Sequence, residues 1–435
     1  MTLEGYRGKL LEILSNAKCS IGDDIVIVTE SRSIEGVLMP RYQYADAEHL
    51  VLKLKNGYNI GISADRIKKI KQIGKGKEPS FATPPKPEQT PGLPKVLILG
   101  TGGTIASRID YRTGGVRAVI SSEELYHLVP ELSSIAEITT DILFNIYSEN
   151  MTSEHWSKIA TRVAEAIRAG YDGVVITHGT DTLHYTSAAL TFALESPPLP
   201  VVLVGAQRSS DRPSSDSASN LIGAVKFAAE SRAKGVFVVM HDGPSDDELA
   251  VHSGVRVRKL HTSRRDAFKS VNSEPVARVK NDKIEILEES IREEKESGSF
   301  RLLEKFDDRA ALLKVYPGFH HSIIKDLVDN GIRGFILEGT GLGHAPKSSY
   351  EAIAYAMNKG AFIGMTSQCI NGSVRMTVYD TGRDLLSIGV KPLGDMLSEV
   401  ALAKLMWALG NFDTSEVGDI MTKNLRGEMQ ERRLL

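Results

Sequence analysis

The chain has 435 residues, of which 41% are hydrophobic and 25% are charged, so it is long enough for two or three domains and has an ordinary globular composition. Its formal net charge of −2 carries no overall signature of a nucleic-acid or membrane binder. Its two cysteines, Cys19 and Cys369, suggest neither a disulfide framework nor a zinc ribbon, and no metal site is predicted.

Targeting signals are not evident in the sequence. No apolar run approaches the roughly 20 residues that span a bilayer, and the first residues lack the basic start and apolar middle of a signal peptide. We therefore expect a cytoplasmic protein without membrane contact.

Residues 1–73 are predicted to form a small β-barrel preceded by one helix near residues 3–16. Short runs alternate between apolar and polar residues, and Asn56-Gly57 is the standard signal for a tight hairpin turn. The last of these runs, "RIKKIKQIGKGK", is basic. It is either a solvated strand whose lysines protect a sheet edge or a weak patch that faces RNA.

A proline-rich linker is predicted at residues 74–94, "GKGKEPSFATPPKPEQTPGLP". After it, strand, glycine turn and helix alternate, as in "KVLILGTGG" and "GVVITHGTD", which predicts an α/β fold with a parallel sheet. We expect a larger domain over residues 95–300 and a smaller one over residues 301–412, with the charged stretch 281–309 separating their strands. The polar tail at residues 413–435 is either frayed or a partner-docking element.

The first strand of the larger domain ends in "GTGGTIAS", residues 100–107, which invites a phosphate-loop interpretation. The motif lacks the lysine of a P-loop and the third glycine of a dinucleotide-binding turn, and Thr104 stands in that place. Nucleotide binding is therefore disfavoured. A hydroxyl at a helix N-terminus faces backbone N–H donors, which suits the binding or formation of an oxyanion.

A second polar cluster follows the apolar strand in "DGVVITHGTDTLHYTS", residues 172–187. Thr180 and Asp181 lie there at a strand-to-helix turn, where ligands collect in open α/β sheets. The alternative is that these residues only cap the helix that follows. The motif alone does not decide between the two.

A threonine hydroxyl is a weak nucleophile and needs a group that takes its proton. Tyr111 follows Thr104 in a glycine-containing segment that could act as a lid. Lys259 lies in "SGVRVRKLHTSRRDAFKS", where partial burial and nearby cations would favour a neutral amine that serves as a base, tuned by Asp181. These cations are Arg256, Arg258, Arg264 and Arg265. The competing interpretation of this basic run is a solvated surface.

Four motifs together resemble the bacterial-type L-asparaginase/glutaminase family: "TGGTIAS", "ITHGTDT", "GAQRSSDRPSSDSASNL" and "RKLHTSRRDAFKS", in this order. The resemblance covers roughly residues 95–410. It implies a two-domain asparaginase-like architecture and hydrolysis of a side-chain amide through a covalent acyl-threonine, with release of ammonia.

The resemblance also assigns catalytic roles. Thr104 would be the first threonine and the nucleophile, supported by Tyr111, while Thr180, Asp181 and Lys259 would form a second triad. Which threonine attacks first stays open. Chemically, one hydroxyl can attack the carbonyl while the other, beside Lys259, activates water or relays a proton.

The segment "NIYSEN" resembles the substrate-binding loop of the family. Ser148 would hold the α-carboxylate of the substrate, and Asp181 its α-amino group. Glu149 stands in this loop where many family members carry glutamine. This departure implies slow hydrolysis of free asparagine or glutamine.

The barrel and linker are extra to the asparaginase pattern, and the whole chain resembles the branch of the family that releases ammonia within archaeal glutamyl-tRNA(Gln) amidotransferases. That resemblance implies a homodimer within a heterotetramer. Its partner, the E subunit of the amidotransferase, would bind Glu-tRNA(Gln), activate the glutamate with ATP and Mg, and use the ammonia. We expect no cofactor in this chain and tRNA contact mainly through the partner.

Two other hypotheses remain. The chain could be a free-standing cytosolic L-asparaginase whose N-terminal barrel is an oligomerisation or regulatory module. It could also be a non-catalytic amide sensor or scaffold that kept the fold. The presence of every motif hydroxyl, acid and lysine disfavours the last hypothesis.

Overall fold

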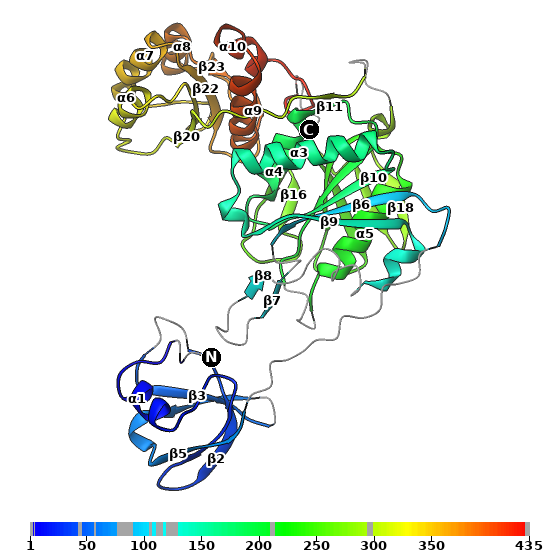
Figure 1. Ribbon diagram of the computed structural model, residues 1–435. Coiled ribbons are helices and arrows are strands. Elements are labelled where there is room, and N and C mark those ends of the chain that lie inside the picture. Colours follow the sequence, from blue (N-terminus) through cyan, green and yellow to red (C-terminus); the bar gives the residue numbers. More distant parts are fainter. Residues whose placement is uncertain are drawn as a thin grey trace. The chain divides into compact units, whose positions relative to one another are not determined.

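The computed structural model describes residues 3, 5–41, 46–55, 58–75, 90–103, 107–109, 116–118, 129–208, 214–293 and 299–430. The chain divides into two compact units, the first made of Met1–Pro85 with Ser107–Arg117 and the second of Lys86–Ala106 with Ala118–Leu435 (Figure 1). Most of the predicted linker lies outside the described residues.

The N-terminal region is an antiparallel five-stranded sheet with strand order β4-β3-β2-β1-β5. Its elements are α1 (Gly8–Asn16), β1 (Asp24–Val28), β2 (Ser33–Leu38), β3 (His49–Lys53), β4 (Asn59–Ser63) and β5 (Lys69–Gly74). Residues on alternate positions of β1 and β3 are buried, as the alternating sequence predicts. Asn56 and Gly57 lie outside the described residues, but the flanking strands pair antiparallel as a hairpin requires.

In this strand order, β4 and β5 lie at the two edges of the sheet. On the edge strand β5, Lys69 and Lys71 are exposed and Ile70 between them is buried. Lys68 pairs with Glu30 at 2.8 Å. This arrangement favours the solvated, edge-protecting interpretation of the basic run.

The second unit contains an eight-stranded sheet with strand order β18-β17-β14-β13-β12-β10-β6-β9. These strands are β6 (Lys95–Gly102), β9 (Glu137–Ile146), β10 (Gly173–Thr177), β12 (Pro200–Val204), β13 (Gly235–His241), β14 (Glu248–Ser253), β17 (Ala277–Lys280) and β18 (Lys283–Ile286). The parallel arrangement is confirmed for β9, β6, β10, β12 and β13. The other three strands join antiparallel, so the sheet is mixed.

The charged stretch 281–309 does not separate the two sets of strands as predicted. It contains β18, the edge strand of the large sheet, and β19 (Arg301–Leu302), which pairs with β11 (Leu194–Glu195). An edge strand needs only one apolar face, and β18 alternates between exposed and half-buried positions. The strand β18 was therefore not predicted, because its exposed positions carry charged residues.

Helices cover both faces of the large sheet, and the sheet with these helices is here called the large lobe. They are α3 (Ser153–Arg168), α4 (Leu183–Ala193) and α5 (Ser217–Glu230). Val174 and Ile176 of β10 pack with residues of α3 and α4, whereas Val175 packs with residues of α5. Burial on both faces explains why β10 reads as a continuous apolar run.

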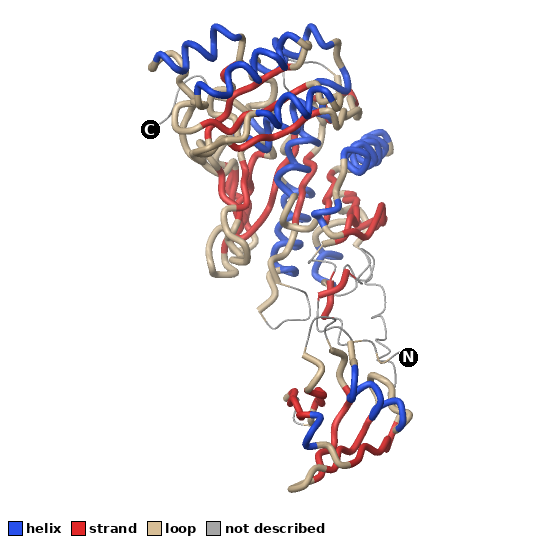
Figure 2. Tube along the Cα trace, turned by 90° about the vertical axis from the view of Figure 1, so that its left-hand side faces the viewer, coloured by secondary structure: helices blue, strands red, loops and turns tan. Residues whose placement is uncertain are grey.

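The small lobe is a parallel sheet with strand order β20-β21-β22-β23 and its surrounding helices. Its elements are β20 (Ala310–Lys314), α6 (Ser322–Asp329), β21 (Gly334–Gly339), α7 (Tyr350–Asn358), β22 (Phe362–Ser367), α8 (Asp380–Ile388), β23 (Lys391–Pro392), α9 (Ser398–Asn411) and α10 (Thr414–Thr422). Figure 2 shows the strands of the second unit flanked by helices.

The two lobes share one apolar core, in which α9 packs on α4 and the rings of Phe192 and Trp407 stack with centroids 5.5 Å apart. The tail is not frayed through Gln430. Val417 and Met421 of α10 are buried in the shared core, and Glu428 pairs with Lys404 at 2.6 Å with both side chains fully buried. Within the described ranges, no helix combines the length and apolar character needed to cross a membrane.

Candidate active site

Three chain segments meet beyond the carboxyl ends of β6, β9 and β10. β6 and β10 are parallel neighbours with Gly100 opposite Thr177. Gly103 has φ +86°, and a Cβ at this position would lie 2.3 Å from the backbone N of Gly179. A Cβ on Gly179 would lie 2.7 Å from the Cβ of Ser148. Glycine is therefore required at both positions for the three segments to approach one another.

Lys259 joins Thr180 and Asp181 in one contact. Its Nζ donates hydrogen bonds of 2.8 Å to Thr180 Oγ1 and of 2.8 Å to Asp181 Oδ1. Lys259 ends β15 (Val257–Lys259), which pairs with β16 (Phe268–Ser270). Thr180 is 6% exposed and the Lys259 side chain 8%, whereas the Asp181 side chain is 71% exposed. The hydroxyl and amine are thus enclosed, while the carboxylate faces solvent.

The predicted substrate loop adjoins these residues. Ser148 begins a short 3-10 turn, Ser148–Asn150, and is 4% exposed, and its side chain lies against Gly179. Thr182 Oγ1 donates a hydrogen bond of 2.7 Å to the carbonyl oxygen of Ser148. Glu149 is exposed. The loop after β9 and the turn after β10 are therefore fixed to each other.

The helix-capping interpretation fails for this turn. Thr182 directly precedes α4, but its hydroxyl points to Ser148 rather than to the N–H groups of the helix. The hydroxyl of Thr180 accepts a hydrogen bond from Lys259, which is 79 residues away in sequence. Both threonines therefore serve contacts between chain segments instead of satisfying the helix end.

Thr104 and Tyr111 lie outside the described residues. Gly103, which precedes Thr104, lies against Gly179 as described above. Two residues earlier, Thr101 Oγ1 donates a hydrogen bond of 2.8 Å to the carbonyl oxygen of Thr177. The chain is thus attached to the end of β10 up to the residue before Thr104.

The buried side chain of His178 supports the turn through hydrogen bonds, a role that was not predicted from the sequence. Trp156 Nε1 donates to Thr186 Oγ1 at 3.0 Å, Thr186 donates to His178 Nε2 at 2.9 Å, and His178 Nδ1 donates to the Gly179 carbonyl oxygen at 2.6 Å. This directional chain requires a neutral imidazole. Complete burial lowers the pKa of His178 to about 4, which keeps it neutral.

The four arginines around Lys259 do not crowd it with unbalanced charge, which corrects the expectation from the sequence. Each has a carboxylate partner: Arg256 pairs with Asp395, Arg258 with Glu399, Arg264 with Asp266 and Arg265 with Asp246. The solvated-surface alternative is also wrong for Arg256, which is 3% exposed. Asp395 and Glu399 belong to the small lobe and lie more than 130 residues from Arg256 and Arg258, so the local sequence does not predict these two ion pairs.

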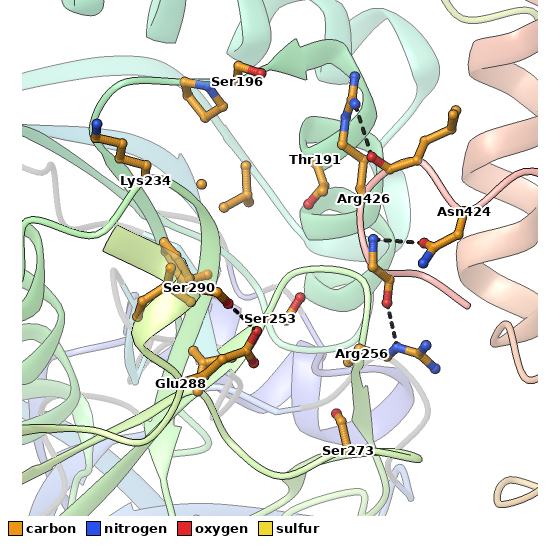
Figure 3. Close-up of a pocket in the computed structure, with 18 of the residues that line it drawn as sticks. Thr191, Ser196, Lys234, Ser253, Arg256, Ser273, Glu288, Ser290, Asn424 and Arg426 are labelled. Carbon is orange, nitrogen blue, oxygen red and sulfur yellow. Dashed lines mark hydrogen bonds between the residues drawn. The ribbon is translucent and has the colours of Figure 1, made fainter. Parts of the chain in front are cut away.

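A cavity of about 460 Å³ lies at the opposite end of the large sheet (Figure 3). It is bounded by the start of β13, the end of β14 and the C-terminal turn, residues 424–430. The candidate site lies at the carboxyl ends of the parallel strands, so this cavity is a separate feature.

Comparisons with known proteins agree with the fold. The description "Asparaginase, N-terminal" matches residues 95–292, "Glutaminase/Asparaginase C-terminal domain" matches residues 309–421, and "GatD N-terminal domain" matches residues 19–73. The thermostable L-asparaginase from Thermococcus kodakarensis superimposes with a TM-score of 0.68 at 35% identity, covering 78% of this chain and 100% of the asparaginase. For L-asparaginase I from Vibrio cholerae the TM-score is also 0.68, at 29% identity over the same shares. The fold and site thus define an asparaginase-like amidohydrolase.

Relatives with the same domain composition narrow the class. The D subunit of glutamyl-tRNA(Gln) amidotransferase from Metallosphaera sedula is 49% identical over 100% of this chain and 98% of its own length. The D subunit from Thermococcus kodakarensis is 48% identical over 97% of each chain. This chain belongs to the family of glutamyl-tRNA(Gln) amidotransferase D subunits.

Proposed function

We propose that the chain releases ammonia from the side-chain amide of L-glutamine or L-asparagine and supplies it to a partner that converts Glu-tRNA(Gln) to Gln-tRNA(Gln). The observation that carries this proposal is the contact of Lys259 with Thr180 and Asp181, beside the turn that holds Ser148. Lysine, threonine and carboxylate in hydrogen-bond reach are the parts that an activated hydroxyl requires.

The chemistry follows from these groups. In the proposed mechanism a threonine oxygen, assigned to Thr104 with support from Tyr111, attacks the carboxamide carbon and forms an ester. The hydroxyl proton passes to the departing nitrogen, which leaves as ammonia. Water then hydrolyses the ester, and Lys259 beside Thr180 is assigned to take and return a proton in one of these steps. The same bonds form and break if Thr180 attacks first.

Substrate binding is assigned to three residues. The exposed carboxylate of Asp181 can accept hydrogen bonds from the α-ammonium of the substrate, and Ser148 is assigned to its α-carboxylate. Glu149, exposed in the same turn, places a negative charge near that carboxylate. This repulsion supports slow turnover of free amino acids until the partner and Glu-tRNA(Gln) are bound.

The partner is proposed to be the E subunit of the amidotransferase, in a heterotetramer built on a homodimer of this chain. ATP, Mg and most contacts to the tRNA are assigned to that partner, with no cofactor in this chain. The cytoplasm is the proposed location. A formal net charge of −2 supports this division, since tRNA binding depends on basic surface.

Full-length similarity favours this function over that of a free-standing asparaginase. The two asparaginase structures match 78% of the chain, whereas the Metallosphaera sedula D subunit matches all of it. Deleting residues 1–94 separates the two functions. A free-standing enzyme would keep its activity and specificity, whereas we expect the truncated amidotransferase chain to lose tRNA-dependent stimulation.

The decisive experiment is an ammonia assay on the Thr104→Ala variant in complex with the E subunit. We expect loss of glutamine-dependent amidation of Glu-tRNA(Gln), with amidation by added ammonium retained. Loss of both activities would assign Thr104 to folding or assembly. Fast hydrolysis of free glutamine by the wild-type chain alone would contradict the proposed dependence on the partner.

A further inference from the structure

Helix α9 of the small lobe contacts both α4, which follows Thr180, and Arg258, which precedes Lys259. Thr180 and Asp181 lie in the turn that leads into α4, and α4 packs on α9 through the shared core that contains Phe192 and Trp407. Lys259 belongs to β15, and the preceding residue of that strand, Arg258, pairs with Glu399 of α9. The spacing between the threonine and the lysine therefore depends on one helix that belongs to neither segment.

Arg258 connects β15 to the first turn of α9. Its Nη2 lies 2.7 Å from Oε1 of Glu399, and the two side chains are 26% and 6% exposed. Successive side chains of a strand point to opposite faces, so Arg258 faces α9 while Lys259 faces Thr180. A displacement of the arginine would shift the neighbouring amine with it.

A second buried pair holds the base of the same hairpin. Arg256 Nη1 donates to Asp395 Oδ2 at 2.8 Å, and Arg256 Nε donates to the carbonyl oxygen of Gly427 at 2.7 Å. The backbone N of Gln430 donates to Asp395 Oδ1 at 2.9 Å. Figure 3 shows Arg256 and the C-terminal turn at the wall of the separate cavity. The β15–β16 hairpin is therefore attached to the small lobe through both Arg256 and Arg258, and to the C-terminal turn through Arg256. These two arginines lie two residues apart and so share one face of the strand.

The Arg258–Glu399 pair is poorly built for stability. Glu399 is 4% exposed, and its Oε2 has no hydrogen-bond partner among the described residues. Burial raises the pKa of Glu399, which Arg258 opposes, while the nearby Glu338 raises it further and Lys314 lowers it. A buried ion pair with an unsatisfied oxygen often contributes less to stability than apolar residues of the same size. Stability alone therefore does not account for the pair.

We infer that Arg258 and Glu399 are positioning residues through which the small lobe sets the amine of Lys259 against Thr180. The inference rests on the proposed amidohydrolase function. It assigns neither residue any contact with substrate. Because a displacement of about 1 Å can cost on the order of 100-fold in rate, loss of the pair should reduce kcat more than it changes KM.

The test compares Arg258→Met with Arg426→Met in the full-length chain complexed with its partner subunit. Arg426 forms the matched control pair, with Glu195 at 3.0 Å and side chains 9% and 16% exposed. We expect Arg258→Met to lower kcat for glutamine-dependent ammonia release about 10–100-fold with KM changed less than about 3-fold. Arg426→Met should keep kcat within about 2-fold of wild type.

A double variant separates positioning from stability. Replacing both partners, as in Arg258→Met with Glu399→Met, removes the uncompensated buried charge and should restore thermal stability towards the wild-type value. If the pair positions Lys259, kcat of the double variant stays as low as that of Arg258→Met. Recovery of kcat along with stability would overturn the inference, and so would equal kcat in Arg258→Met and Arg426→Met.

The two proposals can fail separately. Wild-type complex that releases no ammonia from glutamine or asparagine would overturn the proposed function, and this inference with it. Active wild-type complex with an unaffected Arg258→Met variant would overturn only the inference. If Arg258→Met does not fold, Arg258→Lys keeps the charge without the guanidinium fork, and we expect a smaller loss of kcat with unchanged KM.

Discussion

β10 of the large lobe and β21 of the small lobe are both fully buried parallel strands that run into turns containing glycine and threonine. After β10, Thr180 is buried and accepts a hydrogen bond from Lys259. After β21, Thr340 is exposed, and its hydroxyl donates to the carbonyl oxygen of His344 within its own turn. One turn becomes a candidate active site, whereas the threonine of the other bonds within its own turn.

The comparison teaches that the local pattern of a strand end does not define a site. Ser367 at the end of β22 gives another example, because this polar residue at a strand end uses its Oγ to donate a hydrogen bond to the carbonyl oxygen of Gly341 in the neighbouring turn. What distinguishes the end of β10 is a set of partners brought from distant segments. Lys259 arrives from β15, and Ser148 arrives from the end of β9.

The largest expected difference between the two turns concerns Lys259. Lys259→Met should lower glutamine-dependent ammonia release by at least about 1,000-fold, since the threonines lose their base. Thr340→Val, the matched change in the small lobe, should keep the rate within about 2-fold of wild type. Ammonia assays on both complexes check this prediction, and retention of ammonium-dependent amidation controls for folding. Comparable losses in the two variants would show that the turns are equivalent.

A second difference concerns crowding by glycine substitutions. In Gly179→Ala the new Cβ would lie 2.7 Å from Ser148 Cβ, so the substrate turn must shift and kcat/KM should fall about 10–100-fold. In Gly339→Ala the new Cβ would lie 2.5 Å from Met365 Sδ and 3.0 Å from the backbone N of His344. This change should cost about 1–3 kcal/mol of stability with little effect on activity.

Steady-state kinetics and thermal unfolding of both alanine variants separate these effects. A Gly179→Ala variant with normal kcat/KM would contradict the close packing described for the three segments. A Gly339→Ala variant with lost activity would give the turn after β21 a catalytic role.

A third expected effect is on the pH dependence of stability. Burial lowers the pKa of His178 and His252 to about 4 and that of His184 to about 3, and all three lie in the large lobe. The unfolded chain takes up these protons near pH 6.5 and the folded chain only at lower pH, so stability is complete above 6.5 and is lost as pH falls. The loss is about 1.4 kcal/mol per pH unit for each histidine until its folded pKa is reached.

Calorimetry between pH 7 and pH 5 checks this prediction. His178→Gln should reduce the slope of stability against pH, whereas His320→Gln, at an exposed position of the small lobe, should leave it unchanged. A slope that does not respond to His178→Gln would mean that another group controls acid unfolding.

Several features were predictable because they are encoded locally. Continuous apolar runs identified β6, β10, β12 and β13, since strands buried on both faces carry little else. The glycines and polar residues at their ends placed Thr180 and Asp181 at a strand-to-helix turn. The antiparallel strand β18 was missed because its charged residues occupy exposed positions. The packed C-terminal turn was missed because its Glu428 is paired with Lys404, 24 residues away in sequence.

By itself the sequence identified the residues to which we assign the chemistry, because hydroxyl, carboxylate and amine are properties of side chains and their motifs are short. Only the tertiary structure decided that Lys259 Nζ lies 2.8 Å from side-chain oxygens of both Thr180 and Asp181, and that Arg256 and Arg258 are balanced by carboxylates of the small lobe. Such contacts join residues 78 or more positions apart, and no local pattern specifies them. They exist because the sheet and the shared core of the two lobes bring the segments together.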